Sequence, residues 1–476
     1  MLAAGFISFP ILTRIFSVSE YGILGLINTT IFIAVAIGKF GFPNSIVRFY
    51  QDFRSQKSLS SFYSTMVFSS AGIAAIIATL FGVVTHFIPT RFIGVDTVGL
   101  LYLVPVLIFI GCTNDIFTSF LRAEQKTKLY NLISVIHRYG SLSLCIFIVF
   151  FFVKGLYGFY IGQVISGIMV LTFLIYYFSK RWRISAKSFS KVILGDSIKF
   201  GLPLVWAELG HLVLNYADRY LVQLFLGSIS LGLYTAGYNL ATYVAEVIIY
   251  PINYAMTPVY MDILVNKGEE ETKVFFTKLF RYFILILSPV VFGFIAVSRD
   301  LLMVLASSKY MEAYTILPYV VIGQSIYACS IILNSGLFIR KKTHLLTVIM
   351  IGVCFLNVGI NIILIPLFGI LGAAQATLIS YICYTLIITY YAFKEFRFRI
   401  EYGRILLYLA LGATMYLVIN MINGKSPLDN LIMKIPAGAF IYFILVLILD
   451  RDVRSTLAKM IWKSNKLKHK FMLQNK

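Results

Sequence analysis

The sequence predicts an all-α polytopic membrane protein with about fourteen transmembrane helices. Of its 476 residues, 59% are hydrophobic and 13% are charged, whereas soluble proteins carry about 25% charged residues. The mean hydropathy is +0.86, and apolar stretches follow one another along the whole chain. Because lipid offers no partner to backbone groups, these stretches must be helices, and a β-barrel would instead show short alternating segments.

The expected helices cover residues 1–16, 22–47, 61–88, 99–120, 129–153, 157–178, 200–226, 231–260, 281–305, 313–338, 345–367, 369–393, 404–422 and 431–449. Most of them approach or exceed the roughly 20 residues that a spanning helix needs. The first is shorter, about 24 Å against a hydrocarbon core of about 30 Å, which leaves open a start upstream of Met1.

Lysine and arginine are concentrated in every second loop between the predicted helices. Of the 41 lysines and arginines, 31 lie after the even-numbered helices up to the twelfth and in the tail that follows Asp450. Seven lie on the opposite side, so the bias places both termini and the 179–199 loop in the cytoplasm. An error in the helix count would destroy this alternation. Because the basic residues do not share one soluble face, no nucleic-acid partner is expected despite the net charge of +21.

The sequence lacks the motifs of metal sites, nucleotide-binding loops and hydrolases. The five cysteines lie inside apolar stretches without CxxC spacing, as buried structural cysteines do. Gly424-Lys425-Ser426 resembles the end of a phosphate-binding loop, but Ile419 stands where that loop needs glycine. No HExxH or GxSxG motif occurs. We therefore expect no enzyme activity, no metal site, no cofactor and no direct use of ATP.

Weak internal repeats at an offset of about 210 to 217 residues predict two similar halves. Residues 155–166 resemble residues 369–380, and the basic loops at 126–128 and 342–344 precede them. Repeated six-helix lobes are a known transporter plan. The predicted divisions are an N-terminal lobe of residues 1–195, a C-terminal lobe of 196–393, helices 13 and 14 in 394–450, and a basic cytoplasmic tail of 451–476. The tail is expected to lie as a helix on anionic lipid.

Four segments resemble bacterial polysaccharide and O-antigen flippases of the MATE-like superfamily, which also holds multidrug exporters and the lipid II flippase. They are Phe9-Pro10-Ile11-Leu12-Thr13-Arg14, Ser19-Glu20-Tyr21-Gly22, the stretch 41–49, and Asp218-Arg219-Tyr220 followed by Gly232-Leu233-Tyr234. The resemblance covers about residues 1–393. It implies a multi-pass protein of the bacterial cytoplasmic membrane.

Ionisable side chains inside the predicted helices are the candidates for a site, because a charge in hydrocarbon costs at least about 2.5–3.5 kcal/mol. The substrate-binding candidates are Lys39, Asp115, His137, Arg138, Arg14 and Arg48, with Asn357 and Asn361 in the second half. Basic residues dominate, which suits a pyrophosphate because arginine offers a planar fork of donors. The alternatives are snorkelling of Lys39 and Arg48 to the cytoplasmic end, an Arg138–Asp115 pair, and simple packing of the two asparagines.

Two polar stripes at helical spacing are candidates for ion coupling. Helix 7 carries Glu208, His211, Asn215 and Asp218, and helix 8 carries Asn239, Thr242, Glu246 and Asn253. A coupling site for Na+ or H+ would use Glu208 and Glu246 as titrating groups. The alternative is interhelical hydrogen bonding, worth only about 0.6 kcal/mol per contact. For Asp218 and Arg219 we expect a structural or gating role.

The resemblance implies a flippase that moves a polyprenyl-pyrophosphate-linked oligosaccharide from the inner to the outer leaflet, by alternating access, for cell-surface polysaccharide synthesis. The alternatives are an ion-coupled multidrug exporter or lipid II flippase and, with less support, a polysaccharide polymerase, which would need a larger outside loop than the one around residues 89–98. Expected partners are the lipid-linked oligosaccharide, membrane lipids and other polysaccharide assembly proteins.

Overall fold

The computed structural model describes residues 2–56, 58–87 and 98–455, and every regular element within them is a helix. The first half contains α1 (Leu2–Ile15), α2 (Val18–Gly38), α3 (Phe42–Ser55), α4 (Leu59–Phe87), α6 (Val98–Leu101), α7 (Leu103–Ala123), α8 (Thr127–Phe151) and α9 (Gly155–Ser179), with η2 (Ala186–Ser188) in the loop that follows. The predicted all-α class is therefore confirmed. Residues 89–97 of the predicted outside loop lie outside the described residues, as does the tail from residue 456.

The second half begins with one very long element. It contains α10 (Lys191–Lys267), α11 (Glu269–Leu305), η3 (Ser308–Thr315), α12 (Leu317–Leu333), α13 (Ser335–Ile339), α14 (Thr343–Phe368), α15 (Ile370–Glu395), α16 (Tyr402–Ile419) and α17 (Pro427–Leu449). Within the described chain, 12 helices are long and apolar enough to cross a membrane. The short α1 adds one segment, and α10 is two segments joined at Gly227, where φ is 80°. All fourteen expected segments are thus present.

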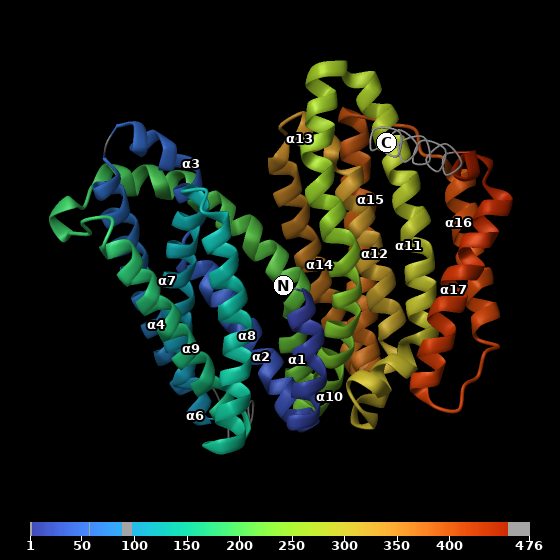
Figure 1. The fold of residues 1–476 in the computed structure, drawn as a ribbon, viewed down its shortest axis with the longest axis horizontal. Helices are drawn as coiled ribbons and strands as arrows, with labels where there is room; N and C mark the ends of the chain where they lie inside the picture. Colours follow the sequence, from blue (N-terminus) through green and yellow to red (C-terminus); the bar gives the residue numbers. More distant parts are fainter. Residues whose placement is uncertain (1, 57, 88–97, 456–476) are drawn as a thin grey trace, which may run out of the picture.

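The predicted helix 22–47 is wrong as a single span. α2 ends at Gly38, with Lys39 as its C-cap, and α3 begins at Phe42. The break follows from two residues with positive φ, Phe40 at 50° and Gly41 at 75°, a backbone region that ends a helix. α3 is polar on one face and lies across the end of the bundle (Figure 1).

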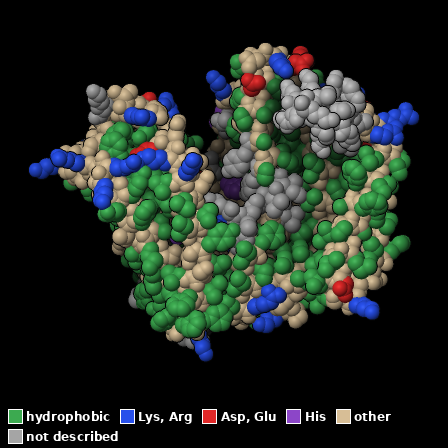
Figure 2. Space-filling view, viewed as in Figure 1, with side chains coloured by type: hydrophobic (Ala, Val, Ile, Leu, Met, Phe, Trp, Pro, Cys, Tyr) green, Lys and Arg blue, Asp and Glu red, His purple; other side chains and the backbone are tan. Residues whose placement is uncertain are grey.

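The helices form two lobes that diverge toward one end. In Figure 1, α3, α4 and α6–α9 form one lobe and α11–α17 the other, with α1, α2 and α10 between them. The lysine- and arginine-rich loops share one end, which we call the basic end. Pairs such as Arg340–Glu269 and Lys342–Glu395 join these loops within one lobe. Figure 2 shows the surface hollowed between the lobes at this end.

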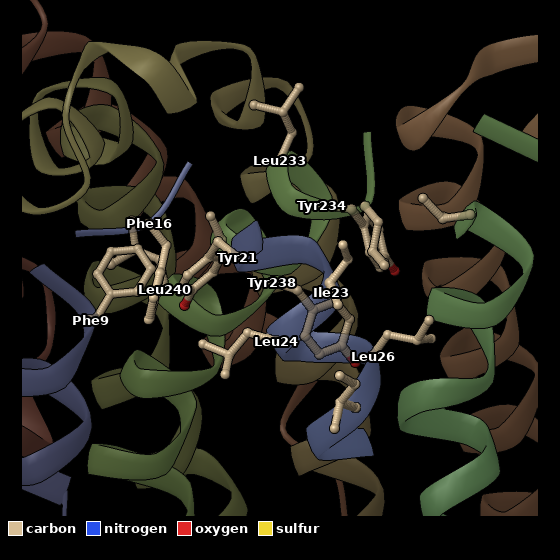
Figure 3. Close-up of a cluster of buried hydrophobic side chains, with 14 of the residues drawn as sticks. Phe9, Phe16, Tyr21, Ile23, Leu24, Leu26, Leu233, Tyr234, Tyr238 and Leu240 are labelled. Carbon is tan, nitrogen blue, oxygen red and sulfur yellow. The ribbon is translucent and has the colours of Figure 1, made fainter. Parts of the chain in front are cut away.

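Toward the opposite end, α2 packs directly on α10, a contact that we call the lobe seam. A Cβ added at Gly22 would lie 2.4 Å from the Ser228 carbonyl oxygen, and one at Gly232 would lie 1.9 Å from the Val18 carbonyl oxygen. Buried aromatic side chains of both helices, Tyr21 among them, surround this close approach (Figure 3). The two backbones can meet at such a distance only because glycine has no side chain.

Replacing Gly22 by alanine is expected to destabilise the protein by about 1–3 kcal/mol, because the new methyl group meets backbone atoms that cannot move aside. Thermal unfolding of the purified protein would measure the loss. Gly72→Ala is the matched control, since a Cβ there would meet nothing within 4 Å, and helix propensity predicts a gain of up to about 1 kcal/mol. Equal melting temperatures for the two variants would contradict the described seam.

Helices α16 and α17 attach to α11 through a buried charge cluster at the basic end. The Asp450 carboxylate is fully buried and lies 3.0 Å from an Arg281 nitrogen and 2.7 Å from an Arg404 nitrogen. The Tyr408 hydroxyl also donates to it. One carboxylate therefore ties three helices together where α17 ends.

Candidate functional site

A polar cavity of about 530 Å³ lies in the N-terminal lobe between α2, α7, α8 and α9. It brings together three of the predicted substrate-binding residues, Asp115 on α7 and His137 and Arg138 on α8. Its other polar lining residues are Asn114, Thr118, Tyr130, Ser134, Ser141 and Gln163. Phe32 of α2 lines the same cavity and lies 6.4 Å, ring centre to ring centre, from Tyr216 of α10, so the cavity reaches the boundary between the lobes.

Arg138 is the cationic group of this cavity that lacks a counter-charge. Among the described residues, no carboxylate lies within 4.0 Å of its guanidinium. The alternative Arg138–Asp115 pair is therefore absent, because Asp115 lies 3.8 Å from the Lys39 ammonium instead. A guanidinium that lines a polar cavity without a carboxylate partner keeps its donors available for an anion.

Lys39 joins α2 to the first segment of α10. Its ammonium lies 2.7 Å from a Glu208 carboxylate oxygen and 3.8 Å from Asp115, and its side chain is 17% exposed. The break after Gly38 places Lys39 here rather than inside a spanning helix. Two carboxylates compensate this lysine, so its charge serves the contact between the lobes rather than the cavity.

The Lys39–Glu208 pair is expected to couple energetically. In a double-mutant cycle with Lys39→Ala and Glu208→Ala, the coupling free energy should be about 0.5–1 kcal/mol, small because Glu208 is partly exposed. Thermal unfolding of the four proteins would measure it. The exposed Arg48–Asp52 pair supplies the control cycle, where coupling should be near zero. Equal coupling in both cycles would refute the contact.

Two predicted arginines lie away from the cavity. Arg14 donates to the Val304 and Leu305 carbonyl oxygens, 2.7 and 3.4 Å away, and so caps the C-terminal end of α11. Arg48 is exposed on α3, 3.3 Å from Asp52, in agreement with the snorkelling alternative. A local acceptor explains both positions: the last carbonyl groups of α11 for Arg14, and the Asp52 carboxylate one turn along α3 for Arg48.

The predicted asparagines of the second half are buried between α14 and α15. The Asn357 side chain donates to the Ser380 hydroxyl over 3.0 Å, and Asn361 donates to the Asn357 backbone carbonyl over 2.9 Å. They are 1% and 0% exposed and do not line the polar cavity. Their contacts agree with the packing alternative.

The predicted ion-coupling residues are distributed over separate contacts. Glu208 binds Lys39, whereas the Asn215 side-chain oxygen accepts from Tyr381 over 2.7 Å. The His211 ring packs 6.2 Å from that of Tyr327. Glu246 lies on α10, but its side chain is outside the described residues.

Asp218 has the most enclosed position of this group. It is 1% exposed and accepts hydrogen bonds from the hydroxyls of Tyr234 and Thr377. Its second oxygen, Oδ1, has no hydrogen-bond partner among the described residues. Of the predicted carboxylates, this one therefore has an unsatisfied buried acceptor.

Several cavity residues were not predicted from the sequence. Tyr130, Ser134 and Ser141 lie on α8 at steps of 3 or 4 residues from His137, which places them on one helical face. This spacing is visible in the sequence and could have identified them. Asn114 and Gln163 are single polar residues on other helices, and no pattern marks them.

Comparison with known proteins assigns the chain to a family. The family model "Polysaccharide biosynthesis protein" matches residues 1–264, more than half of the chain. The chain belongs to this family. An uncharacterised membrane protein of Methanocaldococcus jannaschii is 22% identical over 431 residues, which cover 86% of this chain and 84% of that protein.

Two solved structures share the fold of this polysaccharide biosynthesis protein. The lipid II flippase MurJ in an inward closed conformation superposes with a TM-score of 0.80 at 17% identity, over 95% of this chain and 97% of that one. A multidrug resistance MATE family transporter of the MOP superfamily, in an inward-facing conformation, gives a TM-score of 0.64 at 16% identity, over 82% and 94% of the two chains. The predicted family is thus confirmed by the family model, and the two solved structures show the same fold.

Proposed function

We propose that this polysaccharide biosynthesis protein is a flippase that moves a polyprenyl-pyrophosphate-linked oligosaccharide across the bacterial cytoplasmic membrane. The observation that carries the proposal is Arg138, a guanidinium that has no carboxylate partner among the described residues and lines a polar cavity of about 530 Å³. A cavity of this size is within the range of ligand sites. Arginine binds phosphate oxygens through two parallel N–H donors, so a pyrophosphate fits the available group.

The shape of the molecule supports a route for this substrate. The lobes diverge at the basic end and meet at the lobe seam on the other side. The excess of lysine and arginine at the basic end supports placing it in the cytoplasm. The pyrophosphate and sugars would enter the cleft while the polyprenyl chain stays in lipid. Rocking of the lobes would then open the seam and expose the head group outside.

For the energy source, we propose coupling to Na+ or H+ at Asp218 rather than at Glu208. Glu208 is already neutralised by Lys39 at 2.7 Å. Asp218 is buried and keeps one carboxylate oxygen without a hydrogen-bond partner among the described residues, and this orphaned oxygen suits a cation or proton. A transport rate that is independent of both ion gradients would refute this assignment.

Reconstitution into liposomes tests the function. Fluorescently labelled lipid-linked oligosaccharide should move between leaflets in vesicles that contain the protein and not in empty vesicles, while a cationic dye should not accumulate. Movement of the dye alone would favour the multidrug exporter. Movement of lipid II at an equal or higher rate would favour a lipid II flippase. Sugar transfer without lipid movement would favour the polymerase.

A further inference from the structure

Arg219 is a buried arginine that has no role in the transport route proposed above. It lies on the first segment of α10, about two turns before Gly227, and is 3% exposed. Its guanidinium carbon lies 4.4 Å from the ring centre of Tyr216 and 5.1 Å from that of Tyr238. Two aromatic faces therefore support the charge in place of a carboxylate.

The hydrogen-bond donors of Arg219 are largely unused. Its Nη2 reaches the Asn239 side-chain oxygen at 3.5 Å, but Nε and Nη1 have no acceptor among the described residues. The neighbouring Asp218 accepts from Tyr234 and Thr377 and forms no ion pair with Arg219 in the described structure. Unsatisfied donors on a buried charge are costly, so they call for a ligand or a second state in which they are bonded.

The contacts of Arg219 with Tyr216, Tyr238 and Asn239 lie within α10, and the neighbouring hydrogen bonds connect them to the lobe seam. Asn239, which accepts from Arg219, donates to the Tyr21 hydroxyl of α2 over 3.2 Å. The next residue, Tyr220, shares a hydrogen bond of 2.7 Å with Thr30 of α2. Figure 3 shows α2 between segments of α10 at this level, with Tyr21 and Tyr238 in the buried cluster. If α2 separates from α10, these two hydrogen bonds to α2 break, and the face of α10 that makes them, next to Arg219, is uncovered.

We propose that Arg219 is a second pyrophosphate-binding site, uncovered on the side opposite the basic end when the lobe seam opens, and that it receives the head group before release. This inference rests on the proposed flippase function. Arg138 holds the head group while the cleft is open at the basic end, and Arg219 holds it when the seam is open. The free Nε and Nη1 donors then bond to phosphate oxygens, and a planar fork forms when Nη2 leaves Asn239 and donates beside one of them.

Inhibition by inorganic pyrophosphate from each side of the membrane tests this site. In liposomes with oriented protein, pyrophosphate on the basic side competes at Arg138, and pyrophosphate on the far side competes at Arg219. Wild-type flipping should be inhibited from both sides. Arg219→Lys keeps the charge but loses the fork, and should raise the far-side concentration for half-inhibition at least tenfold, with the basic-side value changed less than twofold. Arg138→Lys should do the reverse.

Arg299→Lys is the matched control, because Arg299 is an exposed arginine on α11, and it should change neither value. Absence of far-side inhibition in the wild type, or unchanged far-side inhibition in Arg219→Lys, would overturn the inference. In both cases flipping and basic-side inhibition persist, so the proposed function would stand. Failure of the wild type to flip the substrate at all would remove both proposals.

A second variant keeps the test decisive if Arg219→Lys does not fold, as judged by size-exclusion chromatography. Tyr216→Leu removes one of the two aromatic faces against the guanidinium and leaves Arg219 itself in place. It should raise the far-side concentration for half-inhibition about threefold. An unchanged far-side value in this variant would count against the site.

Discussion

Replacing Arg138 by glutamine is expected to lower the rate of lipid-linked oligosaccharide flipping at least about tenfold. The glutamine side chain would keep one amide donor group but lose the charge and the fork. A hydrogen bond to a charged group contributes about 1.5–3 kcal/mol, and 1.4 kcal/mol corresponds to a factor of about ten. Because no carboxylate is within ion-pair distance of Arg138 in the described structure, its removal leaves no buried charge unpaired, and protein stability should change little.

Export of glycan in cells and flipping in liposomes would both measure this effect, at equal protein level. Arg48→Gln is the matched control, since it removes an exposed arginine outside the cavity and should leave transport unchanged. Arg138→Lys should retain part of the activity. Full activity of Arg138→Gln would show that the polar cavity of the N-terminal lobe is not the head-group site.

Replacing Asp450 by asparagine is expected to destabilise the protein by about 3 kcal/mol. The substitution removes the negative charge that Arg281 and Arg404 share, and removing one partner of a buried pair costs about 3–5 kcal/mol. Arg404 is partly exposed, which places the estimate at the lower end. Thermal unfolding, read by a probe on α17, would measure the loss. Asp52→Asn, in an exposed pair, should change stability by less than about 0.5 kcal/mol.

The Asp450 carboxylate is also expected to make the stability of the protein depend on pH. Burial alone would raise the pKa of Asp450, but the Tyr408 hydroxyl, the Val453 backbone amide and the Arg281 guanidinium lower the pKa below its usual value. A carboxyl with a lowered pKa stabilises the folded state above its unfolded pKa of about 3.9, and this contribution is lost as pH falls through the folded pKa. The stability gap between wild type and Asp450→Asn should therefore stay constant from pH 8 to about 5. A gap that closes near pH 6 would contradict this.

Hydropathy and charge were enough to predict the helices, because spanning segments need length and apolar character, and the loops alternate in charge. They were not enough at the end of α2. That end depends on the positive φ values of Phe40 and Gly41, which are properties of single backbone positions that an average over about twenty residues does not detect. The break at Gly227 inside α10 lies between the predicted helices 200–226 and 231–260, in agreement with the prediction.

The candidate site was predicted only in part for a similar reason. His137, Arg138 and Asp115 share one cavity, as polar residues inside hydrocarbon often do. The partners of Lys39 and Arg14 could not be predicted, because Glu208 is 169 residues away in the chain and the Val304 carbonyl is 290 residues away. The sequence shows which charged side chains lie in apolar segments, but the groups that pair with them depend on the tertiary packing.

The glycines of the seam have a consequence for how quickly the molecule can change state. Where Gly22 and Gly232 bring two backbones together, no bulky side chain of either helix is locked between its neighbours at that point. Parting the two backbones at that point requires no rotamer change of an intervening side chain, so the barrier to opening arises in the buried aromatic side chains around it, Tyr21 among them. The same close approach makes both positions intolerant of substitution, since one added methyl group would clash with the facing backbone and keep α2 and α10 apart.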